Sequence, residues 1–317
     1  MDGNMKIAII GTGAVGGYYG ALLAKNGFDV HFLLNRDFGH VRQHGLLVES
    51  VDETIRLPNV NAYGRPEDMP PCDIGIVALK TTSNENLKHI LPYAVKPDGA
   101  VVVLQNGLGV EGQVFEVLPG ATITGGLCFL CSNKTGPGHI RHLDYGSIRM
   151  GQYRADERPA GITEELKQIA EIFKKASISV EITDDLGKAR WEKLVWNMPF
   201  NGLSVLLDAD TSELISSIPA QAILREIMLE VIGAARHCGH EIGDALAEKM
   251  IAATRKMVPY KPSMKLDYES GRPLEIGAIY HTPINTASRL GYRMEKSRIV
   301  SLQLEHLDQH KRMPPAS

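Results

Sequence analysis

The sequence contains few cysteines and no long hydrophobic run. Its four cysteines among 317 residues are too few for the disulfide framework of a small secreted protein. No apolar run approaches the ~20 residues that are needed to span a bilayer. The polar start over residues 1–5 leads directly into a strand pattern and lacks the features of a signal peptide. These absences indicate a soluble, cytoplasmic protein.

An excess of charge of either sign is also absent. Lys and Arg number 34, Asp and Glu number 37, and the net charge is −3. This balance lacks the basic footprint of a protein that binds nucleic acid or an acidic membrane, so we expect neither as a partner. A content of 44% hydrophobic and 22% charged residues is that of a folded globular protein. At ~150 residues per domain, the length predicts two domains.

Short apolar strands alternate with helices in the first half of the chain. This alternation predicts a parallel sheet that is buried on both faces. Residues 121–152 then hold apolar runs interrupted by turn residues, which predicts antiparallel strands added to the sheet. We expect strands over 6–10, 29–34, 72–79, 100–104 and 178–182, and helices over 16–26, 84–94 and 162–175.

The hydrophobic period changes near residue 184. From there apolar residues recur at helical spacing, which predicts helices over 184–206, 220–235 and 244–257. We therefore expect an α/β domain over residues 1–183, followed by an all-α domain over residues 184–317.

A glycine-rich turn joins the first expected strand to the first expected helix. Gly11 permits the tight turn, Gly13 allows the backbone to approach a pyrophosphate, and Gly16 allows the helix to pack close to the sheet. The free N–H groups at the helix N-terminus favour a phosphate. A glycine turn without a ligand is the alternative, but the context favours a Rossmann-type dinucleotide-binding domain. Its expected cofactor contacts in the turn are Gly11, Thr12, Gly13, Ala14, Val15 and Gly16.

The end of the second expected strand indicates which dinucleotide binds. NAD sites usually carry an acid there that holds the ribose 2′-hydroxyl, whereas an Arg accommodates a 2′-phosphate. Here Asn35 and Arg36 end the strand and Asp37 is the one competing acid, so we predict NADP(H), with Arg36 as a phosphate ligand. Arg36 as a solvated surface charge is the alternative. Lys80 is a further candidate to line the cofactor crevice, or else a solvated surface lysine.

A polar stripe follows one face of the first helix in the second half. Lys193, Asn197 and Asn201 are spaced by four residues, about 6 Å apart along the axis. Such groups on an apolar helix cost free energy unless they meet solvent, a partner or a ligand, and a solvated face is the alternative. Pro199 removes one helical hydrogen bond and is expected to bend the helix. A lysine here suits carbonyl reduction, with Glu275 as one candidate carboxylate partner.

Two patterns of cysteine and histidine carry less weight. Cys128 and Cys131 form a lone CxxC within an apolar run, where core packing is favoured over zinc or redox use. His237 and His240 have the types of metal ligands but straddle an expected helix end. We predict no metal site.

The ordered set of motifs resembles the ketopantoate reductase (2-dehydropantoate 2-reductase) family along nearly the whole chain. The glycine-rich turn alone is shared by many dehydrogenases, whereas the ordered set is specific. The motifs are Gly11-Thr-Gly-Ala-Val-Gly16, Leu79-Lys80, Gln105-Asn-Gly-Leu-Gly109, Trp191-Glu-Lys193 with Asn197 and Asn201, Pro262-Ser-Met264 with Asp267 and Gly271-Arg272, and Glu275-Ile276. The resemblance implies a Rossmann domain, a helical domain, an active site in the cleft between them, and a place in pantothenate synthesis.

The resemblance also implies roles for individual residues. Lys193 would protonate the ketone oxygen as general acid while NADPH delivers hydride to the carbon, and Glu275 would bind the substrate hydroxyl and help to position Lys193. Asn106 would lie between the nicotinamide and the lysine, so that Asn106 and Glu275 would also contact the cofactor. The carboxylate and hydroxyl groups of the substrate would be held by Asn197, Asn201 and Ser263.

Three functions remain open at this point. The first is NADPH-dependent reduction of ketopantoate, and the second is NADP-dependent chemistry of the same kind on another small 2-keto or hydroxy acid. The third is a non-catalytic NADP(H)-binding redox sensor, against which the polar stripe with Glu275 argues, because a sensor needs no polar catalytic face. The sequence leaves the oligomeric state open, with a homodimer as one form to expect.

Overall fold

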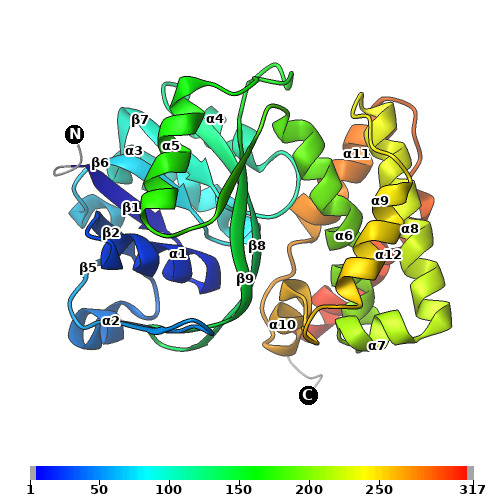
Figure 1. The fold of residues 1–317 in the computed structure, drawn as a ribbon, viewed down its shortest axis with the longest axis horizontal. Helices are drawn as coiled ribbons and strands as arrows, with labels where there is room; N and C mark the ends of the chain where they lie inside the picture. Colours follow the sequence, from blue (N-terminus) through cyan, green and yellow to red (C-terminus); the bar gives the residue numbers. More distant parts are fainter. Residues whose placement is uncertain (1–4, 313–317) are drawn as a thin grey trace. The chain divides into compact units, whose positions relative to one another are not determined.

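The chain forms two compact units, each of which is described by itself (Figure 1). The computed structural model describes residues 5–312, so Met1–Asn4, part of the polar start considered above, lie outside the described residues. The N-terminal unit comprises the chain up to Gln105 together with Val110–Leu186. The C-terminal unit comprises the chain from Gly187 on together with the short segment Asn106–Gly109. The division after Leu186 lies close to the expected boundary, whereas the excursion of Asn106–Gly109 was not expected.

The N-terminal unit is built around one β-sheet. Its strands within the described residues are β1 (Lys6–Ile10), β2 (Asp29–Leu33), β3 (Leu46–Glu49), β4 (Thr54–Leu57), β5 (Asn61–Tyr63), β6 (Cys72–Val77), β7 (Val95–Val103), β8 (Thr122–Gly136), β9 (His139–Gln152) and β10 (Val180–Thr183). The strand order is β4-β3-β9-β8-β7-β6-β1-β2-β5, and β10 pairs with β9. Neighbours from β8 through β5 in this order are parallel, while β8 and β9 form a long antiparallel hairpin. The predicted parallel sheet with added antiparallel strands is confirmed.

The strand order reverses at β1, which has β2 on one side and β6 on the other. The residues Ile7–Ile10 of β1 are completely buried, because helices and further strands cover both faces of the sheet. In open α/β sheets, ligands bind at the carboxyl ends of the strands where the order reverses. The turn that follows β1 therefore lies where this fold binds its ligands.

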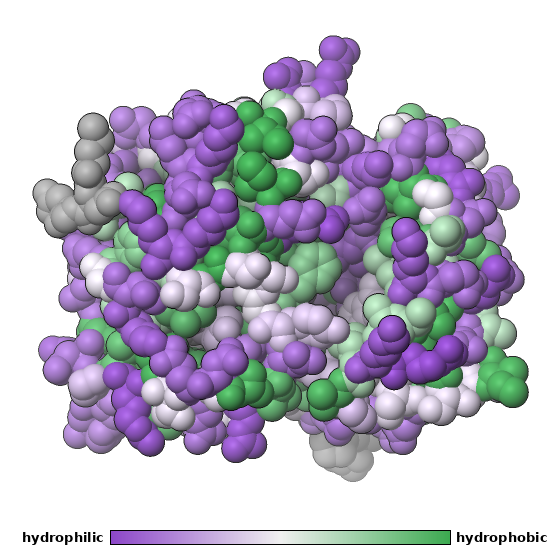
Figure 2. Space-filling model, viewed as in Figure 1, coloured by the Kyte–Doolittle hydropathy of each residue, from purple (hydrophilic) through white to green (hydrophobic). Residues whose placement is uncertain are grey.

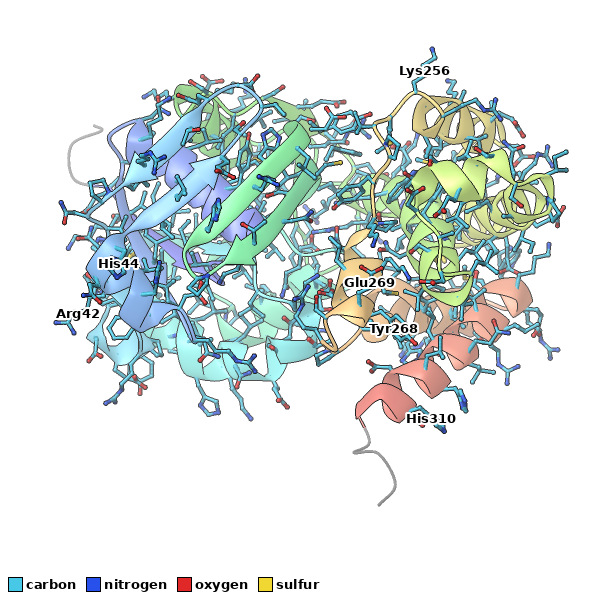
Figure 3. All side chains as sticks on the ribbon, turned by 90° about the horizontal axis from the view of Figure 1, so that it is seen from below. Arg42, His44, Lys256, Tyr268, Glu269 and His310 are labelled. Atoms are coloured by element: carbon cyan, nitrogen blue, oxygen red, sulfur yellow. The ribbon has the colours of Figure 1, made fainter. Side chains whose placement is uncertain are left out.

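Helices cover the sheet of the N-terminal unit. They are α1 (Ala14–Lys25), α2 (Phe38–His44), α3 (Leu87–Ala94), α4 (Val110–Val117) and α5 (Glu164–Lys175), with 3₁₀ turns at Pro66–Asp68 and Thr81–Asn86. α3 packs with α4 and against β6 and β7, and α5 packs against β9 and β10. The last turn of α2 carries Arg42 and His44 (Figure 3), and the positive charge of Arg42 suits a helix C-terminus.

The sheet curls around α1, which contacts β1 and β2 and also β3, β4, β8 and β9. A Cβ atom at Gly20 would lie 2.6 Å from the ring of Phe32 in β2, and one at Gly17 would lie 2.7 Å from Ile140 in β9. The helix is buried without a break from Gly16 to Leu23. Because these glycines have no side chains, strands can pack closely on two faces of α1. This close packing places the β8–β9 hairpin near the glycine-rich turn.

Several short elements of the N-terminal unit were not predicted. These are α2, α4 and the strands β3, β4 and β5, which hold between three and eight residues each. Elements this short carry too few hydrophobic repeats to stand out, and their pairing depends on strands that are distant in sequence. The expected helix over 84–94 begins as a 3₁₀ turn and becomes α-helical at Leu87.

Helices alone make up the described part of the C-terminal unit. They are α6 (Leu186–Leu206), α7 (Thr211–Ser216), α8 (Ile218–His237), α9 (Ala245–Thr254), α10 (Ser263–Glu269), a π-helical turn (Gly277–His281), α11 (Thr282–Arg289) and α12 (Glu295–Arg312). The predicted all-α half is confirmed, although α7 and α10 to α12 were not predicted individually. α6 continues through Pro199 as one helix of 21 residues.

Buried polar contacts fix α12 against α8. The carboxylate of Glu230, in the middle of α8, accepts hydrogen bonds from the backbone N–H groups of Lys296 at 2.9 Å and Ser297 at 2.8 Å. Glu230 thereby satisfies N–H groups in the first turn of α12 and places a negative charge at the positive end of that helix. This contact joins two helices that are far apart in sequence.

The surface mixes polar and apolar groups. In Figure 2, hydrophilic residues in purple alternate with smaller green hydrophobic patches on the visible face. Among residues 5–312, no helix has both the length and the apolar character that a membrane crossing requires.

Candidate functional site

The glycine-rich turn has the geometry that its sequence predicts. Gly11 has φ +100°, and a Cβ atom there would lie 2.4 Å from the backbone nitrogen of Leu79. A Cβ atom at Gly16 would lie 2.3 Å from the carbonyl oxygen of Gly11. At Gly13, the N-cap of α1, a Cβ atom would meet nothing within 4 Å. Two glycines therefore serve close packing, while the third leaves open space before the helix N-terminus, where a phosphate is favoured.

The predicted residues of the N-terminal unit gather around this turn. The Thr12 hydroxyl donates a hydrogen bond to the carbonyl of Leu33 at 3.0 Å, which links the turn to the end of β2, just before the exposed Asn35 and Arg36. Gln105 donates from its amide to the carbonyl of Leu79 at 2.8 Å. This bond holds the chain beside the exposed Lys80. The carboxyl ends of β6, β1 and β2 thus bring together the turn and the predicted cationic and amide side chains.

The carboxylate of Asp37 is engaged by groups of the protein itself, which argues against a role as a ribose ligand. One of its carboxylate oxygens accepts a hydrogen bond from the Gly138 backbone N–H at 2.9 Å and forms an ion pair with Lys134 of β8. The Lys134 ammonium also donates to the Thr12 carbonyl at 3.3 Å, within the glycine-rich turn. Sequence reasoning missed Lys134, because only the pairing of the β8–β9 hairpin and its curl over α1 bring it here.

The polar stripe on α6 is mostly buried. Asn197 is 6% exposed and Asn201 is 2% exposed, while Lys193 is half-buried. A solvated helix face would expose the two amides, so that alternative is wrong. The Asn201 side-chain oxygen accepts a hydrogen bond from the Met264 backbone N–H at 3.1 Å, and this bond brings α10 and its Ser263 next to the stripe.

Asn106 and Glu275 lie on two segments of the C-terminal unit that pack together. Leu108 donates from its backbone N–H to the carbonyl of Ala278 at 3.0 Å, and Gly107, with φ +101°, leaves no room for a Cβ atom against the same carbonyl. Glu275 is only 4% exposed and begins the segment that continues into Ala278. The excursion of Asn106–Gly109 therefore has a structural cause, which is its packing on the π-helical turn.

A tyrosine of this π-helical turn forms hydrogen bonds with backbone groups of α6. The Tyr280 hydroxyl donates to the carbonyl of Met198 and accepts from the backbone N–H of Gly202, the two groups that an uninterrupted α-helix would pair with each other. Tyr280 is completely buried, and burial raises the pKa of its hydroxyl far above the usual range, so the hydroxyl keeps its proton. Sequence reasoning missed Tyr280 because no motif marks it.

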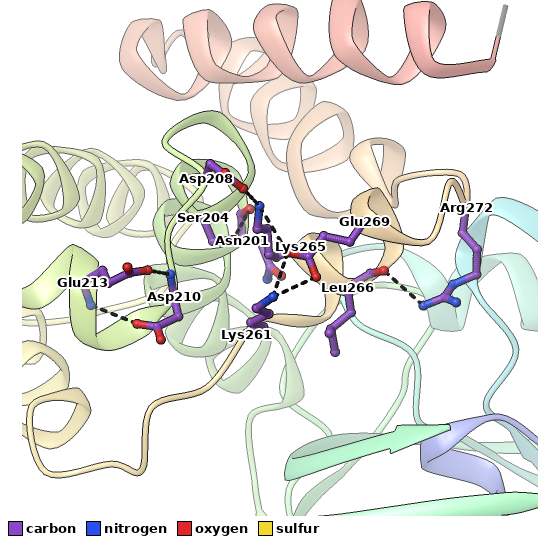
Figure 4. A network of polar contacts seen from close by, with 10 residues as sticks. All are labelled: Asn201, Ser204, Asp208, Asp210, Glu213, Lys261, Lys265, Leu266, Glu269 and Arg272. Carbon is purple, nitrogen blue, oxygen red and sulfur yellow. Dashed lines mark hydrogen bonds and ion pairs between the residues drawn. The ribbon is translucent and has the colours of Figure 1, made fainter. Parts of the chain in front are cut away.

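Ion pairs hold α10 in place. The Lys265 side chain is 2% exposed and its ammonium forms an ion pair with Asp208, just beyond the end of α6, and contacts Glu269 at 3.5 Å (Figure 4). Figure 3 shows Glu269 on the same short helix. Arg272 donates to the buried Asp267 carboxylate at 2.9 Å. This bond holds the chain just before Glu275 against α10. Ser263 is thus carried on a helix that is anchored at both ends.

The cysteine and histidine patterns take no part in this arrangement. Cys131 is buried, and burial raises the pKa of its thiol to about 12, so the thiol stays protonated, as its packing role requires. Cys128 is partly buried against the core of the N-terminal unit. No group of three or more metal-ligating side chains occurs in the part of the chain that the structure describes.

Comparisons with known proteins agree with these two units. Residues 7–155 match the family described as Ketopantoate reductase PanE/ApbA, and residues 185–306 match the family described as Ketopantoate reductase PanE/ApbA C terminal. A 2-dehydropantoate 2-reductase of Nostoc sp. is 50% identical over 307 residues, which cover 97% of this chain and 96% of that protein.

Solved structures show the same fold. The crystal structure of 2-dehydropantoate 2-reductase from Geobacter metallireducens GS-15 is 40% identical and has a TM-score of 0.90, covering 95% of this chain and 99% of that one. D-mandelate dehydrogenase in a ternary structure with NADH and anilino(oxo)acetate has a TM-score of 0.85 over 98% of this chain and all of that one. Its 20% identity shows a shared fold alone. The resemblance inferred from the motifs is confirmed, and the chain belongs to the ketopantoate reductase PanE/ApbA family.

Proposed function

We propose that this protein reduces 2-dehydropantoate to pantoate with NADPH as the hydride donor. The observation that carries the proposal is the stripe on α6, in which the half-buried Lys193 lies on the same helix face as the buried amides of Asn197 and Asn201. Burying an amide costs free energy unless it meets a polar partner, and a small polar substrate can be such a partner. The 50% identity to a 2-dehydropantoate 2-reductase over nearly the whole chain supports this substrate over other keto acids.

The N-terminal unit fits a nicotinamide dinucleotide. The open space at Gly13, in front of the first N–H groups of α1, suits a pyrophosphate. When bound, the cofactor would supply hydride to the keto carbon of the substrate. The contacts proposed for it are the turn residues Gly11, Thr12, Gly13, Ala14, Val15 and Gly16, with Asn35, Arg36 and Lys80 and, from the C-terminal unit, Asn106 and Glu275.

The C-terminal unit would supply the groups that contact the keto acid. Reduction builds negative charge on the ketone oxygen, and Lys193 would give that oxygen a proton. Glu275 would accept a hydrogen bond from the substrate hydroxyl and orient the ammonium of Lys193. The substrate's carboxylate and hydroxyl groups would be bound by Asn197, Asn201 and Ser263. The assignment of residues 1–183 to the cofactor and 184–317 to the substrate is part of this proposal, as are a cytoplasmic location and a homodimer.

A panel of keto acids with NADPH and NADH in parallel tests the proposal. We expect the highest kcat/KM with 2-dehydropantoate and NADPH. The absorbance of the reduced nicotinamide measures the rate of each reaction. 2-Oxoisovalerate, which lacks the hydroxymethyl group, should react less well because it has no hydroxyl for Glu275. A preference for another keto acid would favour a different substrate in the same family. Binding of NADPH without oxidation by any member of the panel would favour a sensor.

Gly13→Ala should separate cofactor binding from stability. The new Cβ atom meets no protein atom within 4 Å, and the φ of −91° suits alanine, so the free energy of unfolding should stay the same or rise by about 0.5 kcal/mol. The same Cβ atom fills the space proposed for the pyrophosphate, so the Kd for NADPH should rise about tenfold or more. Calorimetric titration with NADPH and thermal melting would measure the two effects.

Gly243→Ala is the matched control for this variant, because a Cβ atom there also meets nothing within 4 Å, but in the C-terminal unit. It should leave the Kd for NADPH unchanged. Unaltered NADPH binding in the Gly13→Ala protein would mean that the pyrophosphate does not approach this turn.

A further inference from the structure

Lys134 occupies a position between the glycine-rich turn and the end of β2. Its ammonium donates to the Thr12 carbonyl at 3.3 Å and forms an ion pair with Asp37, which follows Arg36. Lys134 comes from β8, a strand more than a hundred residues further along the chain, and the neighbouring Ser132 hydroxyl also reaches the turn, at the Ala14 carbonyl. The β8 strand therefore contributes side chains to the region in which the cofactor is proposed to bind.

The ion pair determines what Asp37 can do. Asp37 is the one acid that follows the end of β2, where an NAD site would place a carboxylate on the ribose hydroxyl. Its side chain is 13% exposed, and one oxygen of its carboxylate is engaged by both Lys134 and the Gly138 backbone N–H. A carboxylate held in this way is neutralised and turned toward the hairpin, so it is a poor acceptor for a ribose hydroxyl.

The local charge changes accordingly. Arg36 and Lys134 are cationic, Asp37 is anionic and Asn35 is neutral, so these four residues carry a net charge of +1. Without Lys134 the sum would be zero, and the Asp37 carboxylate would be uncompensated. A 2′-phosphate carries about −1.5 to −2 charges at neutral pH, whereas a 2′-hydroxyl carries none. A change of one positive charge therefore acts on the binding of NADPH and hardly on that of NADH.

We propose that Lys134 is a specificity-determining residue for NADPH, because it withdraws Asp37 from the ribose and supplies positive charge for the 2′-phosphate. The inference rests on the proposed use of NADPH and adds a residue from a strand outside the nucleotide-binding motif. D-mandelate dehydrogenase, which shares this fold, is seen with NADH. The proposed role of Lys134 explains how this protein could favour NADPH although Asp37 follows β2.

Binding measurements on the purified full chain test the proposal without any turnover. Lys134→Ala should raise the Kd for NADPH about 10- to 100-fold and change the Kd for NADH by less than about threefold. The fragments 2′,5′-ADP and 5′-AMP should show the same contrast, since they differ in the 2′-phosphate alone. Lys134→Arg should keep the preference for NADPH, because the charge remains. Calorimetry and the fluorescence of the reduced nicotinamide give the dissociation constants.

Two further variants separate specificity from structural support. Asp37→Asn combined with Lys134→Ala should recover part of the lost NADPH affinity, because the uncompensated carboxylate is gone. Lys96→Ala is the matched control: Lys96 also pairs with an aspartate, Asp73 at 2.5 Å, but at the amino end of the parallel strands. It should change neither Kd. Thermal melting of each variant checks that the fold is retained.

The outcomes distinguish the inference from the proposed function. Equal losses of NADPH and NADH affinity in Lys134→Ala would show that Lys134 only supports the turn, and no loss would also overturn the inference. A wild-type protein that binds NADH as tightly as NADPH would overturn the proposed cofactor itself. A Lys134-dependent preference for NADPH in a protein that leaves 2-dehydropantoate unreduced would uphold the inference and reject the reductase.

Discussion

Lys193→Ala should lower kcat with 2-dehydropantoate by about 10³-fold while NADPH still binds. Proton transfer from a positioned side chain typically contributes about 10²- to 10⁴-fold to a rate. Lys193 is the lysine of the stripe on α6. Alanine cannot give a proton to the ketone oxygen, so charge would build up there without compensation. Stopped-flow absorbance of the reduced nicotinamide at saturating NADPH would measure the loss.

The same helix provides a matched control. Lys188 is also half-buried on α6, but five residues earlier, which places it about 140° around the helix axis from Lys193. Lys188→Ala should change kcat by less than about twofold. Lys193→Arg keeps the positive charge on a group that hardly gives up its proton, so it should also lose most of the rate. Turnover at the wild-type rate in Lys193→Ala would remove Lys193 from the mechanism.

How far the sequence predicts this protein depends on how local each feature is. The glycine-rich turn is set by three glycines within six residues: Gly11 and Gly16 allow the predicted close packing, and Gly13 leaves open space before the helix. The stripe on α6 is equally local, because helical spacing alone places its members on one face. The two halves of the chain were therefore predictable in outline, the first from alternating strands and the second from helical periodicity.

Lys134 and Tyr280 show what sequence reasoning could not reach. Lys134 meets the turn only because β8 pairs with β9 and the hairpin curls over α1, which depends on glycines that accept close strands. Tyr280 meets α6 from a segment more than seventy residues away. Neither contact leaves a spacing or a motif in the sequence. The hydrogen bond of Asn201 to Met264 likewise depends on the packing of α10, which is too short for its own periodicity to be recognised.

The contact of Tyr280 with α6 predicts a strong constraint at Gly202. A Cβ atom at Gly202 would lie 2.0 Å from the Tyr280 hydroxyl oxygen, which is itself fixed by the carbonyl of Met198. Neither partner can move easily, since Tyr280 is completely buried and Gly202 lies within a long helix. Pro199 lacks a backbone N–H, so α6 already lacks the helical hydrogen bond to the Val195 carbonyl in the neighbouring turn.

Gly202→Ala should therefore lower the free energy of unfolding of the C-terminal unit by about 3 kcal/mol, because it combines overpacking with loss of the hydroxyl's hydrogen bonds. Tyr280→Phe alone should cost only about 1 kcal/mol, since the Met198 carbonyl and the Gly202 N–H can then pair with each other. In the double variant the new methyl group takes the place of the hydroxyl, so it should be more stable than Gly202→Ala by about 1–2 kcal/mol.

Tryptophan fluorescence during urea unfolding can measure this cycle, because both tryptophans of the chain, Trp191 and Trp196, lie on α6 and report on the C-terminal unit. Gly243→Ala, with nothing within 4 Å of the new Cβ atom, should stay within about 0.5 kcal/mol of the wild type. Strictly additive effects of Gly202→Ala and Tyr280→Phe would mean that the hydroxyl does not limit the space at Gly202. A positive coupling would instead show that the helix carrying Asn197 and Asn201 is held in shape by a side chain from the segment that begins at Glu275.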